Sequence, residues 1–298
     1  MKFIIIALST FFFMALGHAQ KEAIKFNEAN LLDHVEVLSS DAFEGRETGT
    51  SGNEKARAYI VEQFQKLNVK PFTDSYNQTF EYKRGEVVKT GINLVGYIKG
   101  TQYPKKYVVI SAHHDHLGKK QGKIFNGADD NASGISALFS FAEVLTKNPP
   151  KHSVILVAFD AEEYGINGSS YFVEAMKDKS IMMNLNMDMI SRSSKDELYV
   201  VGTRYSEPLT SIIGSFENPT NTKLLEGHDG TDNKDDWTYA SDHGPFHKAG
   251  IPFLYFGNED HEAYHKPDDD FETITPKFYV NAVKIIITVF KAIDRTDF

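Results

Sequence analysis

Histidine and acidic residues occur in short clusters along the sequence, and the first cluster contains His113 and Asp115. Side chains two residues apart in an extended segment point to the same side. An imidazole next to a carboxylate is typical of a metal ligand whose ring is oriented by an acid. A histidine with ordinary hydrogen bonds near a strand end explains the pair equally well, so the pair alone identifies no site.

A second cluster lies in residues 127–134, which read GADDNASG and are expected to form a loop that enters a helix. Asp130 lies at or near the expected start of that helix. A carboxylate in this position could bind a cation, but acids are also common caps of helix N-termini. The flanking glycines would let the backbone approach another group closely.

The run Asp160-Ala161-Glu162-Glu163 is the sharpest chemical signal in the chain. Neighbouring carboxylates directly after a buried strand repel each other and are costly to desolvate. A bound cation would offset that cost. Because adjacent side chains diverge, one glutamate could bind the cation while the other stays free to transfer protons. The alternative is a solvated turn.

Asp188 and His265 are two further candidate ligands. Asp188 lies between two methionines, where a carboxylate needs a partner, either a cation or a salt bridge to Arg192. Residues 261–265 read HEAYH and match the HExxH zinc motif, which binds metal only on a helix. The polar residues before this segment and Pro267 after it disfavour a helix, so only His265 is kept as a ligand.

The elements that must position these residues can be recognised from hydrophobic patterns. Continuous apolar runs suit strands buried on both faces of a parallel or mixed sheet. Helical periodicity lies between them in residues 51–67 and 135–145, and a last helix has Thr275 as its N-cap and Pro276 as its first residue. Alternating strands and helices predict an α/β sandwich. The expected strands are residues 106–111, 153–159, 181–187 and 251–256.

Each of these four strands is followed by candidate ligands. In open α/β sheets, sites form outside the carboxyl ends of the strands. We therefore expect the imidazoles and carboxylates to gather at one edge of the sheet and to bind metal there.

The composition sets further limits. The 298 residues, 41% of them hydrophobic, suffice for one large domain, which we expect over residues 20–298. The formal net charge of −9 disfavours a nucleic-acid or anionic-membrane partner. Because the chain has no cysteine, thiolate ligands, a cysteine nucleophile and disulfides are excluded.

Residues 1–19 have the pattern of a secretory signal peptide that is cleaved after Ala19. Lys2 precedes an apolar run from Phe3 to Leu16, and small residues stand before the cleavage point. The run is shorter than the ~20 residues of a spanning helix, so a membrane anchor is the weaker alternative. We expect an exported protein, periplasmic or secreted, with no membrane contact after cleavage.

Taken together and in this order, the motifs resemble those of the co-catalytic di-zinc exopeptidases of metallopeptidase family M28. This family includes secreted bacterial leucyl aminopeptidases, glutamate carboxypeptidase and glutaminyl cyclase. The resemblance implies a three-layer αβα sandwich with a central mixed, mostly parallel sheet. The matching segments are residues 46–52, 112–118, 127–134, 159–165, 186–189 and 264–267.

The resemblance also implies a metal-binding role for each matching position. Asp130 would bridge two zinc ions, His113 and Asp188 would complete one site, and Glu163 and His265 would complete the other. Three ligand carboxylates and a bridging hydroxide would neutralise two Zn²⁺.

The catalytic roles are implied in the same way. Glu162 would be the general base for a metal-bridging water, Asp115 would orient His113, and Tyr264 would hydrogen-bond the developing oxyanion. The segment 241–243 also recurs in relatives near the substrate, without a definite role.

The function expected from this resemblance is an aminopeptidase that hydrolyses the N-terminal peptide bond of peptides. A carboxypeptidase or dipeptidase of the same fold should show an arginine cluster near the site, and between Glu163 and the last helix only Arg192 and Arg204 are candidates. A mono-zinc glutaminyl cyclase would lack the histidine at position 113. A receptor-like domain without activity would have lost ligands, and this sequence keeps all five.

Overall fold

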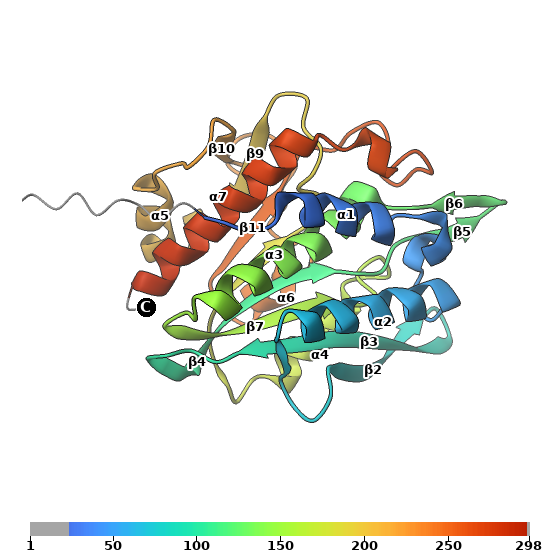
Figure 1. Ribbon diagram of the computed structural model, residues 1–298, viewed down its shortest axis with the longest axis horizontal. Coiled ribbons are helices and arrows are strands. Elements are labelled where there is room, and N and C mark those ends of the chain that lie inside the picture. Colours follow the sequence, from blue (N-terminus) through green and yellow to red (C-terminus); the bar gives the residue numbers. More distant parts are fainter. Residues whose placement is uncertain (1–23, 297–298) are drawn as a thin grey trace, which may run out of the picture.

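A nine-stranded mixed sheet runs through the middle of the molecule in the computed structural model, which describes residues 24–296 (Figure 1). The strand order is β1-β3-β7-β4-β8-β11-β9-β10, with β2 paired to β3. The signal peptide expected at residues 1–19 lies outside the described residues. The strands are β1 (Lys70–Pro71), β2 (Asn77–Arg84), β3 (Val87–Ile98), β4 (Tyr103–His113), β7 (His152–Phe159), β8 (Ser180–Met187), β9 (Glu197–Val201), β10 (Lys223–Glu226) and β11 (Phe253–Gly257).

The four central strands run parallel to one another in the order β7, β4, β8 and β11. They correspond to the four apolar runs from which strands were predicted. Every residue of β7 is buried, as expected for a strand covered on both faces. Antiparallel pairs occur where β3 joins β7 and where β9 joins β11.

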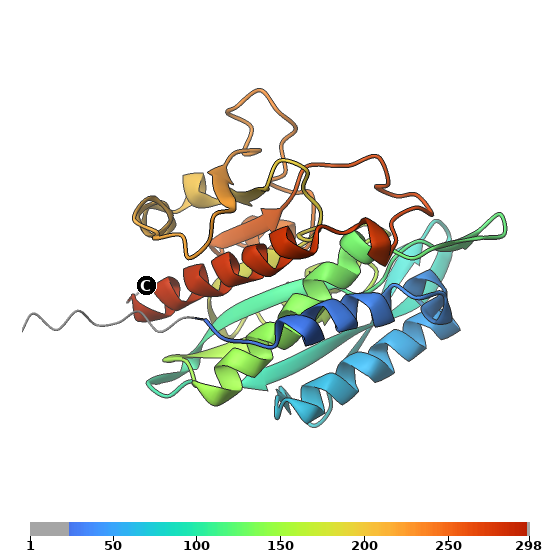
Figure 2. The ribbon, with the colours of Figure 1, turned by 45° about the horizontal axis from the view of Figure 1, so that its top comes forward.

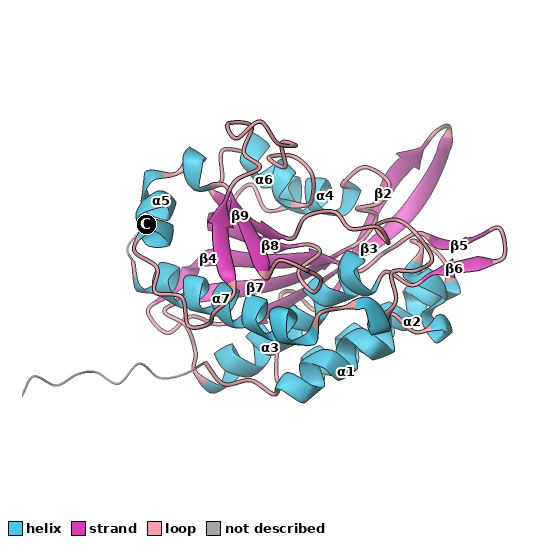
Figure 3. Ribbon diagram, turned by 90° about the horizontal axis from the view of Figure 1, so that it is seen from above, coloured by secondary structure: helices cyan, strands magenta, loops and turns pink. Residues whose placement is uncertain are grey.

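Helices cover both faces of the sheet, as Figures 2 and 3 show. One face carries α1 (Glu28–Leu38), α2 (Ser51–Lys66), α3 (Gly134–Lys147) and α7 (Pro276–Arg295). The other face carries α4 (Asn167–Ala175) and α6 (His243–Lys248), and α5 (Glu207–Gly214) packs beside α7. The predicted three-layer αβα sandwich is therefore confirmed.

The last helix shows how its sequence pattern produces packing. Ile286, Val289 and Phe290 of α7 lie on its apolar stripe and are buried in the main core. Thr275 and Pro276 occupy the N-cap and first positions as predicted, but the Thr275 side chain makes no capping hydrogen bond. Its backbone N–H instead donates to the carbonyl of Ser191, which ties the helix start to the loop after β8.

Short helical turns and one small hairpin complete the described chain. The turns are η1 (Asp41–Arg46), η2 (Ala128–Ser133), η3 (Thr203–Tyr205) and η4 (Phe271–Thr273), and the hairpin joins β5 (Gly118–Lys120) to β6 (Lys123–Phe125). Within residues 24–296, every helix is too short or too polar to cross a bilayer.

Candidate metal centre

The carboxyl ends of the four central strands bring the candidate residues to one edge of the sheet. His113 is the last residue of β4, Glu162 and Glu163 lie in the turn after β7, and Asp188 directly follows β8. His265 lies in the loop after β11. Because these strands are neighbours and parallel, residues far apart in sequence meet at this edge.

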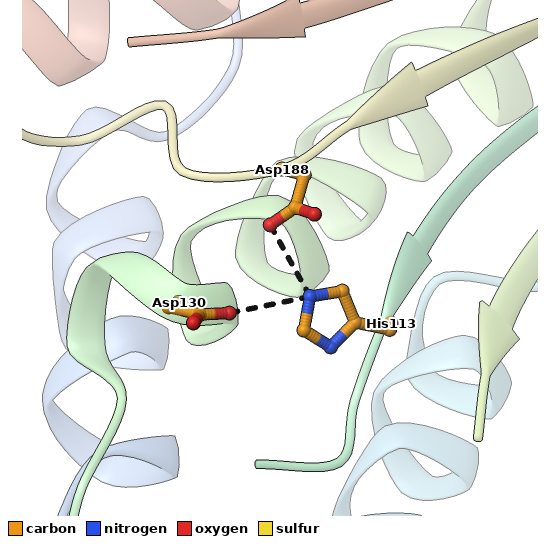
Figure 4. A group of neighbouring side chains, drawn as sticks. All are labelled: His113, Asp130 and Asp188. Atoms are coloured by element: carbon orange, nitrogen blue, oxygen red, sulfur yellow. Dashed lines mark hydrogen bonds and ion pairs between the residues drawn. The ribbon is translucent and has the colours of Figure 1, made fainter. Parts of the chain in front are cut away.

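A first group of ligand atoms surrounds the Nε2 atom of His113 (Figure 4). This nitrogen lies 3.3 Å from Oδ1 of Asp130 and 3.2 Å from Oδ1 of Asp188. All three residues are buried. One imidazole and two carboxylates that converge on a common point can hold a divalent cation.

A second group surrounds the other oxygen of Asp130. Nε2 of His265 lies 3.1 Å from Oδ2 of Asp130 and 3.4 Å from Oε2 of Glu163. His116 also reaches this group, with its Nδ1 2.7 Å from Oε1 of Glu163 and 3.6 Å from Oδ2 of Asp130. The structure thus brings all five predicted ligands together and adds His116, to which the sequence analysis gave no role.

Asp130 is the residue that joins the two groups, because each of its carboxylate oxygens faces a different one. Burial alone would raise its pKa, but the imidazoles of His116, His113 and His265 outweigh burial and hold its pKa well below the usual range. The carboxylate is therefore kept charged and available to cations. It is not a helix cap, since α3 begins at Gly134 and has Ser133 before it.

Asp130 is positioned through its own backbone and the loop before it. The carboxylate of Asp269 accepts the backbone N–H groups of Asp129 and Asp130 at 3.0–3.2 Å. Gly127 has a left-handed conformation with φ of 58°, where a Cβ would collide with the carbonyl oxygen of Asp130. The glycine is needed at this position for both reasons.

Asp115 contacts two parts of the site, although the resemblance assigned it only the orientation of the His113 ring. The Nδ1 atom of His113 lies 3.1 Å from the backbone carbonyl oxygen of Asp115, while the carboxylate of Asp115 is 3.8 Å away. That carboxylate accepts the backbone N–H groups of Glu162 at 3.2 Å and Glu163 at 3.4 Å. Asp115 thus contacts His113 through its backbone and holds the turn of the two glutamates with its side chain.

A cavity of about 370 Å³ opens in front of both groups of ligands. Glu162 and Tyr264 line it, and the ring of Tyr264 stacks on His265 with centroids 3.9 Å apart. Burial, followed by the neighbouring charges of Asp188 and Asp242, raises the pKa of Glu162 well above its usual range despite the opposing effect of His113. A carboxyl group with a raised pKa is suited to accept and return a proton.

The HExxH match at residues 261–265 has no metal-site geometry. The segment forms turns rather than a helix. His261 contacts the buried Asp129 at 3.0 Å, and the exposed Glu262 pairs with Arg192 at 2.6 Å. The rejection of the HExxH match as a zincin-type zinc motif agrees with the structure. Arg192 pairs with Glu262 and is therefore not the salt-bridge partner of Asp188.

Arg46 and Asp269 support the site, although the sequence analysis gave them no role. The buried guanidinium of Arg46 donates hydrogen bonds to the backbone carbonyls of Leu38, His114, Asn126 and Gly127. These contacts tie the loops that carry the ligands to η1. No local pattern marks such a residue, because its four partners lie up to 81 positions away.

The sequence model of peptidase family M28 matches residues 93–290, more than half of the chain. The chain belongs to peptidase family M28. The resemblance seen in the motifs is therefore confirmed, and the family is one of hydrolases that act on peptide bonds. Aminopeptidase YwaD of Bacillus subtilis is 29% identical over 224 residues, which cover 70% of this chain and 46% of the relative. The chain spans about half the length of the curated relatives it matches.

Solved structures confirm the M28 fold at low sequence identity. The zinc aminopeptidase BSAP from Bacillus subtilis superposes with a TM-score of 0.72 at 19% identity, covering 90% of this chain and 96% of that one. Glutaminyl cyclase from Fimbriiglobus ruber superposes with a TM-score of 0.70 at 18% identity, covering 91% and 97%. The fold therefore agrees with both kinds of enzyme, and the site must distinguish them.

Proposed function

We propose that this M28 protein is an aminopeptidase with two zinc ions, which hydrolyses the N-terminal peptide bond of its substrates. The observation that carries the proposal is the position of Asp130. Its Oδ1 faces His113, which also contacts Asp188, whereas its Oδ2 faces His265, which also contacts Glu163. A carboxylate placed in this way can bind two neighbouring cations, one through each oxygen.

The residues present fit such a pair of ions. Ligand atoms at the corners of a tetrahedron around zinc are about 3.3 Å apart, given bonds of about 2.0–2.1 Å. The nitrogen–oxygen separations of the five predicted ligands are 3.1–3.4 Å. Nitrogen and oxygen donors without thiolates suit zinc, and manganese or cobalt could replace it.

The chain's own groups divide the chemistry between them. When bound, two zinc ions would polarise the scissile carbonyl and acidify a water molecule. The Glu162 carboxylate takes the proton of the attacking water and passes it to the leaving amine. The Tyr264 hydroxyl donates a hydrogen bond to the oxygen that develops negative charge.

The acidic lining of the cavity favours the positively charged amino terminus of a peptide over its negatively charged carboxyl terminus. Asp235 and Asp260 line the cavity together with Glu162 and Asp188, and none of its described lining residues is lysine or arginine. Arg192 pairs with Glu262, as noted above, and Arg204 donates to the Asp229 carbonyl. The arginine cluster expected of a carboxypeptidase is therefore not found around the described part of the cavity.

A mono-zinc glutaminyl cyclase is disfavoured by His113. This imidazole lies within 3.3 Å of both Asp130 and Asp188, which together form a complete first group of ligands. A metal count separates the two functions directly, because the cyclase needs one ion and the proposed aminopeptidase needs two.

We also propose that the protein is exported, on the basis of the signal-peptide pattern in residues 1–19. N-terminal sequencing of the protein recovered from the periplasm or medium should begin at Gln20. A cell-associated protein that retains Met1 would contradict this part of the proposal.

The decisive test combines metal analysis with substrate choice. We expect about two zinc ions per chain. Aminoacyl chromogenic substrates should be hydrolysed, amino-blocked versions should not, and a chelator should stop the reaction. One zinc ion per chain, or equal turnover of the blocked substrates, would contradict the proposal.

A further inference from the structure

We propose that His116 is a sixth metal ligand, which binds through Nδ1 the ion that Asp130, Glu163 and His265 hold. This inference rests on the proposed function, since it requires an ion at this position. It makes the two metal positions unequal: His113 is the one imidazole in the first group, whereas His116 and His265 would both serve the second. The function proposed above uses only five ligands and leaves His116 without a role.

The position of Nδ1 relative to its neighbours is the first observation. His116 Nδ1 lies 2.7 Å from Oε1 of Glu163, and His265 Nε2 lies 3.4 Å from Oε2 of the same carboxylate. Both nitrogens also face Oδ2 of Asp130, at 3.6 Å and 3.1 Å. The two rings are separate, with centroids 6.1 Å apart. Two imidazoles thus approach one pair of carboxylates from different sides, as ligands around one ion do.

The second observation is that His116 is buried without hydrogen bonds. Its side chain is fully buried, and neither ring nitrogen makes a hydrogen bond within the described residues. Oε1 of Glu163 is also buried without a hydrogen bond, although it lies so close to Nδ1. Buried polar atoms are almost always paired. Atoms that are close but not directed at each other fit a shared ion, toward which both lone pairs would point.

The third observation is that the ring has little freedom to turn elsewhere. Gly127 packs so closely on it that a Cβ there would lie 2.5 Å from the His116 ring. The backbone N–H of His116 faces the carbonyl of Arg46 at 3.4 Å, and Arg46 in turn binds the carbonyl of Gly127. The same loop therefore positions Asp130 and closes over His116.

The neighbouring histidine shows what an ordinary buried imidazole does in this segment. His114 is equally buried, but its Nε2 lies 3.2 Å from the Ile92 carbonyl oxygen and its Nδ1 lies 3.4 Å from Asn53. Both ring nitrogens of His114 therefore have hydrogen-bond partners within the protein. His116 differs from it because neither ring nitrogen has a hydrogen-bond partner within residues 24–296, while its Nδ1 lies near the carboxylates of Asp130 and Glu163.

Zinc K-edge X-ray absorption on the wild-type protein tests this inference without a substitution. The spectrum counts imidazoles per zinc through their characteristic outer-shell scattering. We expect three imidazoles shared by two ions. Two bound ions with only two imidazoles between them would overturn the inference and leave the proposed function intact. A wild-type protein that binds no zinc would contradict the proposed function itself.

Zinc titration of His116→Gln by calorimetry gives an independent readout. Loss of a group that only orients a ligand costs about 10–100-fold in metal affinity. We expect a larger loss than this at one of the two positions, with the other changed little. His152→Gln is the matched control, because His152 is equally buried but pairs with Asp294 at the opposite end of β7. Unchanged zinc affinity at both positions of a folded His116→Gln protein would overturn the inference.

Discussion

At the scale of single residues, the proposed function assigns metal binding and proton transfer to two adjacent glutamates. Glu162 and Glu163 are adjacent in sequence and both line the cavity, yet Glu163 lies next to His265 and His116 whereas Glu162 belongs to neither ligand group. Their backbone N–H groups both donate to Asp115, so one carboxylate fixes the turn from which the two side chains diverge. Adjacent residues with the same chemistry can therefore have different roles.

We expect Glu162→Gln to lower kcat by about 10²–10⁴-fold, because an amide cannot accept the proton of the attacking water. Zinc content should stay at the wild-type value, since Glu162 belongs to neither ligand group. Steady-state kinetics and metal analysis of the same preparation check both statements.

Glu262→Gln is the matched control for that substitution. Its carboxylate is largely exposed and pairs with Arg192 at 2.6 Å, and exposed ion pairs contribute little. Activity within a factor of about two of wild type is expected, because Glu262 belongs to neither ligand group. A dead Glu262→Gln enzyme would revive the zincin interpretation, and an active Glu162→Gln enzyme would remove the assignment of the base.

At the scale of elements, the ligands depend on loops that are held by buried polar contacts. Arg46 ends η1, and its guanidinium joins the end of α1, the segment after β4 and the loop before η2 through four carbonyl groups. Its burial lowers its pKa to about 10, and the nearby charges of Asp130 and Asp269 oppose that effect. The arginine therefore remains charged at neutral pH beside the acidic site.

Arg46→Met should lower the free energy of unfolding by at least about 3 kcal/mol, because each buried carbonyl left without a donor costs about 1–3 kcal/mol. Denaturant unfolding of the zinc-free proteins measures the change. Arg204→Met is the control: Arg204 is exposed and donates one hydrogen bond, to the Asp229 carbonyl, so a change below about 0.5 kcal/mol is expected. Equal effects of the two substitutions would show that the four-carbonyl contact does not hold these loops.

His34 on α1 should make the packing of that helix sensitive to acid. Its Nδ1 lies 2.7 Å from the Tyr59 hydroxyl and its ring packs edge-on against Phe139 of α3. Burial lowers the pKa of His34, and the charges of Asp33 and Glu143 only partly oppose this. The unfolded chain, with a histidine pKa of about 6.5, thus binds the proton more tightly than the folded protein. The contribution of neutral His34 to stability is fully present above pH ~6.5 and is lost as the pH falls through the folded-state pKa.

We expect His34→Phe to reduce this acid sensitivity. The difference in the free energy of unfolding between pH ~7.5 and ~5.5 should be smaller in the variant than in the wild type, because phenylalanine binds no proton. All other histidines are common to both proteins, so they cancel in the comparison. Identical pH dependence would show that His34 titrates alike in the folded and unfolded states.

At the scale of the whole molecule, the candidate metal centre adds to the hydrogen bonds that already join the loops at the carboxyl edge of the sheet. Its ligands come from the ends of β4 and β8, from η2, from the turn after β7 and from the loop after β11. Without a cation the carboxylates of Asp130, Glu163 and Asp188 are held close together, which costs free energy. Metal binding should therefore stabilise the whole domain and not only the loops.

Removal of zinc should lower the melting temperature in a single shared transition. Zinc at about 100 times its dissociation constant contributes about 2.7 kcal/mol per site. Calorimetry of the chelator-treated protein before and after zinc is restored measures the shift. A melting temperature that zinc does not change would contradict a metal centre in the folded state. Glu262→Gln again serves as the control and should show the wild-type shift.

The sequence by itself determined the class of fold, the strands that carry the site and the family. Apolar runs with the lengths of buried strands, each followed by acids or histidines, sufficed to predict β4, β7, β8 and β11 and the edge where their ends meet. It also determined that His261 and Glu262 are no zincin pair, because Pro267 and the polar residues around them disfavour a helix. These features are local, and local patterns reflect backbone preferences and burial.

Only the tertiary structure decided how the side chains pair across the site. In the folded structure the two oxygens of Asp130 face different ligand groups, and the Asp115 carboxylate contacts the turn that carries Glu162 and Glu163. The fold also brings His116, Arg46 and Asp269 to the candidate metal centre. The physical reason is that each such contact joins segments distant in sequence, and their meeting depends on strand order and loop closure. A spacing of two or three residues can show that a side chain faces the sheet edge, but the partner it meets there is set by the packing of the whole domain.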